Sequence, residues 1–367
     1  MMIFKLNSIN MNKLFIFVSL FTLLVFISSS ELNNENIDNV LDKFMDKSPQ
    51  ELYKVWQQMY KKTEKLEADE SNTRFKVFQQ NLKNILEHNA GNHSYKIGLN
   101  QFSDMTKEEF TQTMGTLKIL KGYELEKAIK RINISNFEIK ENKNLKASYA
   151  PIDYTSSFGP ARNQLKCGSC WAFATTGAVE GAFGLKQGSP YEYLSPQQLV
   201  DCNSNNFGCQ GGYLTNSFEY IKKTGLQLDS TYPYLALKKQ CSFNPTQATA
   251  KVRDYYYCNN YGLDQKKFCS TSATYSLLQY GPAAVTIDAS APNFQSYKSG
   301  IFTSKCSQPN HAVILVGFGT DSTEGDFWII RNSWGSTWGE AGYIRVKINP
   351  SNRNSCFIEE QTWVPLV

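Results

Sequence analysis

The chain has 367 residues, of which 41% are hydrophobic and 19% are charged, and its formal net charge is +5. A chain of this length buries a substantial core, as one large domain or two modest ones. Its positive charge is not gathered into a Lys/Arg block, which argues against a nucleic-acid partner.

Residues 1–30 have the layout of a secretory signal peptide. Lys5 and Lys13 precede an apolar run at 14–27, and three serines follow that run. The run is shorter than the roughly 20 apolar residues of a membrane-spanning helix. We therefore expect a product of the secretory pathway that has no membrane contact after signal removal. A retained signal anchor is the alternative.

Entry into that pathway makes the nine cysteines readable as disulfide partners. All of them lie at or after residue 167. An odd number suggests that one cysteine stays outside the bridges and is reactive.

The region 31–147 contains no cysteine and is predicted to be helical. Ser48, Pro49 and Glu51 form a capping-box start. Further on, steps of three and four keep six residues on one helical face: Glu70, Arg74, Phe78, Asn81, Ile85 and Asn89. Periodicity alone favours an ordinary amphipathic helix here. A second spaced pattern follows at Gly98, Asn100, Phe102 and Asp104.

The segment 122–145 is charged, rich in Asn and poor in apolar residues. This composition predicts an exposed linker that proteases can reach. Sequons for N-glycosylation begin at Asn92 and Asn133.

From Tyr149 onward the composition shifts to aromatic residues, glycine and cysteine. Helical patterns come first, at 169–183, 195–200 and 213–223, and the second of these begins with a capping box at Ser195. Short alternating strands follow at 283–288, 311–317, 327–331 and 343–348. Helices followed by strands predict an α+β fold with two layers or two lobes.

Cys167 and Cys170 form a C-x-x-C pair at the start of the first of these helices. A zinc site needs a second ligand pair, and the next two cysteines lack the spacing of a common zinc module. A redox motif needs a preceding strand, whereas the segment before Cys167 reads as a loop. A nucleophile fits better, because Ser169 is placed to cap a helix whose dipole stabilises a thiolate at Cys170.

A nucleophilic thiol also needs a base. His311 is the single histidine after residue 147, and it stands at the entrance of an apolar strand. A lone histidine is usually structural, but this one is the sole candidate partner for the thiol. Asn332 follows another apolar strand, where its side chain can orient the imidazole.

These motifs resemble papain-family cysteine protease proenzymes of the cathepsin L-like branch. The family signature C-G-S-C-W stands at 167–171, and N-S-W-G-x-x-W-G-x-x-G-Y runs over 332–343. The helical pattern and the pattern at 98–104 match the ERFNIN and GNFD signatures of the family's propeptides, which replaces the interpretation as an ordinary amphipathic helix. The resemblance implies a papain-like two-lobed α+β fold, with a helical left lobe and a β-barrel-like right lobe, preceded by a helical inhibitory prodomain.

The resemblance also implies a role for each matching residue. Cys170 matches the nucleophile, His311 the general acid/base and Asn332 the residue that orients the imidazole. Gln164 matches the glutamine whose amide joins the Cys170 N–H in the oxyanion hole. Trp334 matches the indole that shields the pair from water. The residues implied to bind the peptide substrate are Gly211 and Gly212, by strand addition, with Tyr213, Leu214, Thr286, Ala312, Trp334 and Gln361.

The family's disulfides pair Cys167 with Cys209, Cys202 with Cys241, and Cys306 with Cys356. They leave Cys258 and Cys269 for a fourth bridge, which is not a general family feature, and Cys170 as the odd cysteine. The sequence departs from the family pattern at Leu165 and Phe357, which stand where glycine is usual.

We therefore expect a signal peptide at 1–30, an inhibitory propeptide at 31–147 that fills the cleft in reverse direction, and a papain-like peptidase domain at 148–367. The expected activity is that of a cysteine endopeptidase, made as a zymogen and acting on proteins and peptides through an acyl-enzyme. We expect a monomer without metal or cofactor, in a lysosome-like or food-vacuole-like acidic compartment or outside the cell.

Two absences favour an endopeptidase. The peptidase region has no further histidine, which argues against an occluding loop like that of cathepsin B-like members of the family. The proregion has no cysteine, which argues against a disulfide-tethered minichain like that of cathepsin H-like members. The alternatives are a catalytically inactive binding homologue, and a peptide ligase or exopeptidase on the same site.

Overall fold

The computed structural model describes residues 47–62, 68–114, 117–119, 121, 124, 149–261, 269–349 and 353–367. The chain divides into two compact units, Met1–Phe75 and Lys76–Val367. The expected signal peptide, nearly all of the expected linker, the sequon at Asn133 and the expected start of the peptidase domain at Ser148 lie outside the described residues.

The first unit contains α3 (Pro49–Met59) and the start of α4 (Ala68–Ala90). The capping box predicted at the start of α3 is confirmed. The Ser48 N–H donates to Glu51 Oε2 at 3.1 Å, and the Glu51 N–H donates to Ser48 Oγ at 3.4 Å. These reciprocal bonds satisfy two donors that the helix itself leaves unpaired. The apolar face of α3 then buries Leu52 and Trp56.

In the second unit, the polar members of the predicted helical face fasten the following segment to α4. Asn81 Nδ2 donates to Ser103 O at 2.9 Å. Asn89 is bound to Ile97 in both directions, donating to its carbonyl at 2.7 Å and accepting from its N–H at 3.1 Å. Ile97 ends β1 (Tyr95–Ile97). The regular spacing thus carries two amides that satisfy backbone groups of the next turn and strand.

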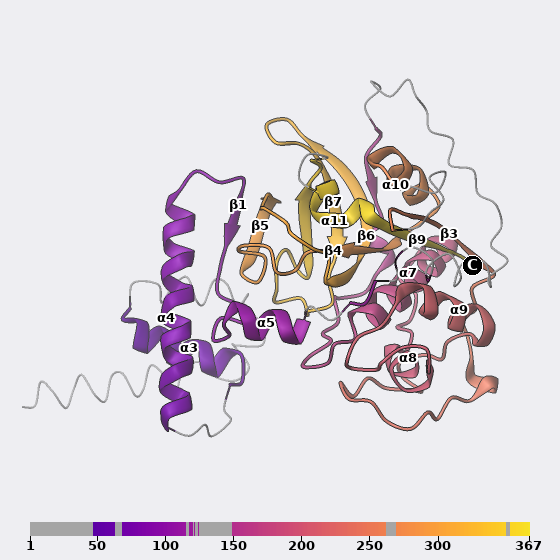
Figure 1. Cartoon of the computed structure of the whole chain (residues 1–367), viewed down its shortest axis with the longest axis horizontal. Helices are drawn as coiled ribbons and strands as arrows, with labels where there is room; N and C mark the ends of the chain where they lie inside the picture. Colours follow the sequence, from indigo (N-terminus) through magenta and orange to yellow (C-terminus); the bar gives the residue numbers. More distant parts are fainter. Residues whose placement is uncertain are drawn as a thin grey trace, which may run out of the picture. The chain divides into compact units, whose positions relative to one another are not determined.

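The helical part of the peptidase region is built around α7 (Cys170–Gln187), which packs against α8 (Pro196–Cys202) and α9 (Leu214–Thr224) (Figure 1). α7 is buried nearly all round, as expected of a central helix. It also packs against strands β4 and β6. Gly177 permits this approach, because a Cβ there would collide with Ile314 of β6.

The strands form one sheet in the order β1-β5-β8-β7-β6-β4-β9-β3, with β2 paired to β6. All pairs are antiparallel except β5 with β8. The strands after β1 are β2 (Ile152–Asp153), β3 (Asp254–Asn259), β4 (Ala283–Ile287), β5 (Tyr297–Phe302), β6 (His311–Asp321), β7 (Gly325–Arg331), β8 (Tyr343–Lys347) and β9 (Gln361–Leu366). Further helices in the described ranges are α5 (Lys107–Met114), α10 (Thr271–Leu278), α11 (Arg353–Phe357), η1 (Thr155–Ser157), η2 (Pro245–Gln247) and η4 (Ile358–Glu360). The predicted α+β class is therefore confirmed.

One local prediction is half wrong. Ser195 caps α8, with its Oγ accepting from the Gln198 N–H at 3.0 Å. The side chain of Gln198 does not return the bond; its Oε1 accepts from the Gln227 N–H at 2.8 Å. A buried backbone donor from another segment has taken the place of the reciprocal half of the box.

Four disulfides cross-link the peptidase region. They join Cys167 to Cys209, Cys202 to Cys241, Cys258 to Cys269, and Cys306 to Cys356. These are the pairs that the family resemblance implied, together with the fourth bridge that it left over.

Candidate active site

Cys170 is the first residue of α7 and is fully buried. Of the nine cysteines it is the one outside the disulfides. Its place at the helix start sets the sulfur at the positive end of the helix dipole, which favours a thiolate. Ser169 is the N-cap residue as predicted, but its hydroxyl makes no capping bond. Its Oγ lies 2.6 Å from the phenol oxygen of Tyr234 instead.

His311 opens β6 and is oriented by Asn332, which follows β7. Asn332 Oδ1 accepts from the Ser333 N–H at 2.8 Å, so His311 Nε2, at 2.9 Å from the same oxygen, is a donor. The neutral ring is therefore the Nε2–H tautomer, and its basic lone pair is on Nδ1. Trp334 stacks on this ring with the centroids 4.7 Å apart.

The environment of His311 favours the neutral ring. Burial is the largest effect and lowers the pKa of His311 to about 4, although the Asn332 hydrogen bond and the backbone of Met114 act in the opposite direction. Met114 ends α5 of the prosegment. The histidine thus lies against the chain segment that precedes the peptidase domain.

Gln164 is fully buried and held on several sides. Its N–H donates to Ser333 O at 2.8 Å, and its Oε1 accepts from Ser333 Oγ at 2.7 Å. Its side-chain amide donates to Cys167 O at 3.0 Å. Because Ser333 also binds Asn332, one chain of hydrogen bonds runs from His311 to Gln164. Our sequence reasoning missed Ser333, although it lies inside the N-S-W-G run.

Aromatic residues of the prosegment cover Trp334. Phe102 and Phe110 pack edge-on against its indole, with centroid distances of 5.6 and 5.1 Å. Gln101 Nε2 donates to Trp334 O at 2.6 Å. Phe102 belongs to the G-x-N-x-F-x-D pattern, so a residue of this sequence motif covers the indole that stacks on His311. The imidazole and the indole are closed off together.

The prosegment also occupies the backbone groups expected to bind substrate. Leu117 pairs with Gly212 as a parallel bridge, and the Lys118 N–H donates to Gly212 O at 3.0 Å. The Leu117 N–H donates to Asn310 O, next to His311, at 2.9 Å. A Cβ on Gly212 would collide with Trp171 and Asn206. The backbone at position 212 can therefore lie this close to Trp171 only because glycine has no side chain.

The other candidate substrate residues fall into two groups. Leu214 and Ala312 belong to the buried apolar cluster that also contains Cys170 and Leu117. Thr286 lies opposite Ala312 in the β4–β6 pair, and its hydroxyl donates to a backbone carbonyl at 2.6 Å. Gln361 starts β9 and is buried. The first group shares its apolar cluster with a prosegment side chain, whereas the second is engaged in the sheet.

Gly211 and Tyr213 flank Gly212, and an aromatic residue missed by sequence reasoning lies beside them. The Phe207 N–H donates to Gly211 O at 3.0 Å, and its ring meets Tyr213 edge-on at 6.1 Å. Phe207 is 50% exposed. Tyr213 is half-buried, so the pair has one exposed ring beside the backbone of Gly211 and Gly212. No spacing in the sequence distinguishes Phe207 from the many other aromatic residues.

Both departures from the family pattern lie at left-handed backbone. Leu165 has φ of 54° and Phe357 has φ of 72°. Glycine adopts such values without steric cost, which explains the usual residue, whereas other residues lose about 1–2 kcal/mol. The Leu165 N–H donates to Asn163 Oδ1 at 2.9 Å, which supports the turn next to Gln164. The loop thus keeps its course despite the substitution.

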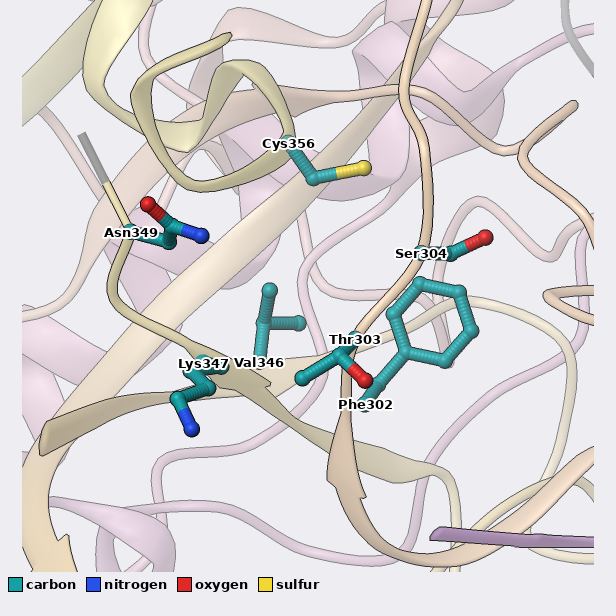
Figure 2. Close-up of a pocket in the computed structure, with 7 residues that line it drawn as sticks. All are labelled: Phe302, Thr303, Ser304, Val346, Lys347, Asn349 and Cys356. Carbon is teal, nitrogen blue, oxygen red and sulfur yellow. The ribbon is translucent and has the colours of Figure 1, made fainter. Parts of the chain in front are cut away.

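A small cavity has none of the candidate catalytic or substrate-binding residues in its lining. Its volume is about 20 Å³, and it is lined by Phe302, Thr303, Ser304, Val346, Lys347, Asn349 and Cys356 (Figure 2). A volume of this size holds about one water molecule, so it is not a substrate site.

Among the described residues, no group of three or more His, Cys, Asp or Glu could hold a metal ion. The helices in the same ranges include none that is long and apolar enough to span a membrane.

A buried cysteine at a helix start, with a neutral histidine under a prosegment, defines a thiol hydrolase held latent by its own chain. Residues 150–366 match the family model described as papain family cysteine protease. Residues 53–110 match the model described as cathepsin propeptide inhibitor domain (I29). The chain therefore belongs to the papain family of cysteine proteases. It is a cysteine endopeptidase zymogen that carries its own propeptide inhibitor.

Individual relatives agree with this assignment over nearly their whole length. A cathepsin L-like proteinase of Fasciola hepatica is 37% identical over 331 residues, which cover 87% of this chain and 94% of that protein. Cathepsin K of Mus musculus is 34% identical over 317 residues, covering 83% and 91%. The solved structure of digestive procathepsin L 3 from the larval midgut of Tenebrio molitor matches with a TM-score of 0.74 and 33% identity, covering 88% of this chain and 100% of that one.

Proposed function

We propose that Cys170, His311, Asn332 and Gln164 carry out the peptide-bond cleavage. The observation that carries this proposal is the chain of hydrogen bonds from His311 through Asn332 and Ser333 to Gln164. It fixes the base and the oxyanion donor to one another through short bonds. Preorganised donors of this kind contribute a few kcal/mol to catalysis.

In the proposed reaction, Cys170 Sγ attacks the scissile carbonyl carbon and its proton passes to His311 Nδ1. The carbonyl oxygen becomes an oxyanion that accepts from the Cys170 N–H and from Gln164 Nε2. The leaving amine takes the proton from Nδ1 as the C–N bond breaks, which leaves a thioester. Water then gives a proton to Nδ1 and adds to the thioester, and the proton returns to sulfur as the acid leaves.

Cleavage within chains, rather than at their ends, is supported by the course of the prosegment. Residues 101–110 lie against Trp334, while Leu117 and Lys118 bind at Gly212 and Asn310. Described parts of one polypeptide therefore lie both at Trp334 and at Gly212 and Asn310. A site that accepts a polypeptide in this way accepts substrates without a free terminus.

The finer assignments form part of the same proposal. We place the signal peptide at 1–30 and the mature N-terminus near Ser148, with Tyr213, Leu214, Thr286, Ala312 and Gln361 lining the substrate pocket. The four disulfides support passage through the secretory pathway. The destination is an acidic lysosome-like compartment or the exterior, and the working form is a monomer.

The test is active-site labelling of the acid-activated full-length protein. An epoxide that alkylates active thiols is expected to modify Cys170 in the wild type and nothing in Cys170→Ser. Peptides blocked at both ends, with Phe or Leu at P2, are expected to be cut by the wild type before labelling and not after it. Properly processed protein that remains unlabelled would show an inactive homologue. Cleavage confined to free termini, or transfer to added amines in place of hydrolysis, would favour an exopeptidase or a ligase.

A further inference from the structure

The phenol of Tyr234 joins the two chain segments that supply the oxyanion donors. Its hydroxyl donates to the main-chain carbonyl of Gln164 at 2.7 Å. The same oxygen lies 2.6 Å from Oγ of Ser169, the residue before Cys170. A phenol has one hydrogen and the carbonyl only accepts, so Ser169 donates the second bond. The Ser169 hydroxyl thus serves this bridge and makes no helix-capping bond.

The bridge is held in place by its surroundings. The Tyr234 ring meets Phe173 of α7 edge-on, with the centroids 4.8 Å apart. Burial, as the largest effect, raises the pKa of Tyr234, so the phenol keeps the hydrogen that it donates to Gln164. The ring thus rests on the helix that begins at Cys170, and its hydroxyl reaches across to the loop of Gln164.

We propose that Tyr234 is a positioning residue for the oxyanion hole, setting the separation between the Gln164 side-chain amide and the Cys170 N–H. The inference rests on the proposed role of Gln164 in that hole. Transition-state donors must match the position of the developing oxyanion closely, because displacement by about 1 Å can cost on the order of 10²-fold in rate. The Tyr234 hydroxyl ties both segments to a single atom.

The experiment compares Tyr234→Phe with Tyr232→Phe in the full-length protein after acid activation. Tyr232 is a buried tyrosine of the same Tyr-Pro-Tyr segment, whose hydroxyl donates to Asp201 at 2.9 Å and accepts from the Ser242 N–H at 3.1 Å. Its removal costs a comparable set of hydrogen bonds away from the hole. Steady-state cleavage of a P2-Leu peptide amide gives kcat and KM separately.

For Tyr234→Phe we expect kcat to fall by about tenfold, with KM within about twofold of the wild type. Tyr232→Phe is expected to leave both constants near the wild-type values. Alkylation of Cys170 by iodoacetamide forms no oxyanion, so its rate is expected to be unchanged in Tyr234→Phe. A general loss of structure would slow alkylation and cleavage together.

A double-mutant cycle with Gln164→Ala completes the test. Gln164→Ala alone is expected to lower kcat by about 10²-fold, and Tyr234→Phe should add no further loss in that background. Independent losses, or a Tyr234→Phe enzyme with wild-type kcat, would overturn the inference while leaving Gln164 in its role. A fully active Gln164→Ala enzyme would remove the proposed hole and this inference with it. Should Tyr234→Phe fail to fold, Ser169→Ala breaks the same bridge at its other end and is expected to give the same pattern.

Discussion

Two histidines of this zymogen have pKa values lowered by burial, and they lie in different regions. His311 stacks on Trp334 and lies next to Met114 of the prosegment. His88 is in the prosegment itself, stacked on His93 with the centroids 4.0 Å apart. The first is closed off by the prosegment, and the second helps to attach it. The comparison separates how latency is maintained from how acid can end it.

At His88 the neutral ring satisfies both of its neighbours. Its Nε2 lies 3.1 Å from Tyr95 O, which only accepts, so Nε2 carries the hydrogen. Its Nδ1 lies 3.3 Å from Asn293 Nδ2, which donates. Asn293 is fixed in that orientation because its Oδ1 accepts from Asn84 at 3.0 Å. A proton on Nδ1 would set two donors against each other at a contact between prosegment and peptidase.

The charged groups around His88 add to this effect. Burial is the largest cause and lowers the pKa of His88. His93 and Lys96 lower this pKa further, whereas the hydrogen bond with the Tyr95 carbonyl raises it. The phenol of Tyr95 also faces the site, and burial raises its pKa, so it stays neutral. No carboxylate is among the groups that shift the pKa of His88.

The sign of the pH effect follows from these directions. Both histidines bind a proton less readily in the docked state than when exposed, where the pKa is about 6.5. Docking is therefore undisturbed above that value, and its stability declines as pH falls below about 6.5 toward the docked pKa values, about 4 for His311. Acid favours release of the prosegment at both sites.

The largest effect is expected where the prosegment covers Trp334. Phe110→Ala removes a ring that packs edge-on against the indole at 5.1 Å, and losses of about 3–5 kcal/mol are usual for buried Phe-to-Ala changes. In the Phe110→Ala zymogen at neutral pH, we expect Cys170 to react with an active-thiol label on the order of 10²-fold faster than in the wild type. Phe110→Leu keeps most of the apolar contact and should stay close to the wild type. Equal labelling of Phe110→Ala and wild type would mean that this contact does not maintain latency.

A second prediction measures the pKa of His311 in the two states. The chain has three histidines, so their ring resonances are assigned with His88→Gln and His93→Gln. In full-length Cys170→Ser, His311 is expected to titrate near pH 4. In processed protein whose Cys170 is blocked as a neutral mixed disulfide, the pKa of His311 should rise by about two units toward the ordinary value for histidine. The same low value in both states would show that the prosegment is not what keeps the ring neutral.

The comparison also shows how far the sequence alone could lead. The spacing of Asn81 and Asn89 predicted a shared helical face, but their bonds to the backbone of Ser103 and Ile97 depend on a chain reversal that spacing does not encode. Cys170, His311 and Asn332 could be proposed because catalysis restricts both residue type and context.

Residues that act through tertiary contacts escaped prediction. Ser333 and Tyr234 hold Gln164 by hydrogen bonds to groups 169 and 70 positions away. Serine and tyrosine are common in every environment, so nothing local distinguishes them. The strands β3 and β9 were missed because they are largely buried and show no clean alternation, the usual signal of a strand.

The smallest and most specific effect is expected at His88. His88→Gln keeps a side-chain N–H for the Tyr95 carbonyl but cannot take up a proton, so the acid-sensitive contact with Asn293 persists at low pH. We expect the pH midpoint of self-processing to move by about half a unit in the acid direction, with unchanged latency at pH 7.5. Processing is followed by the appearance of the mature chain on gels across a pH series.

His93→Gln is the matched control for that variant, because it removes the stacked neighbour and leaves the bonds of His88 to Tyr95 and Asn293 in place. It should move the midpoint less, since it removes only one neighbour that contributes to lowering the pKa of His88. If His88→Gln processed with the wild-type midpoint while staying latent at neutral pH, His88 would have no part in the acid response. The pH dependence would then fall to His311.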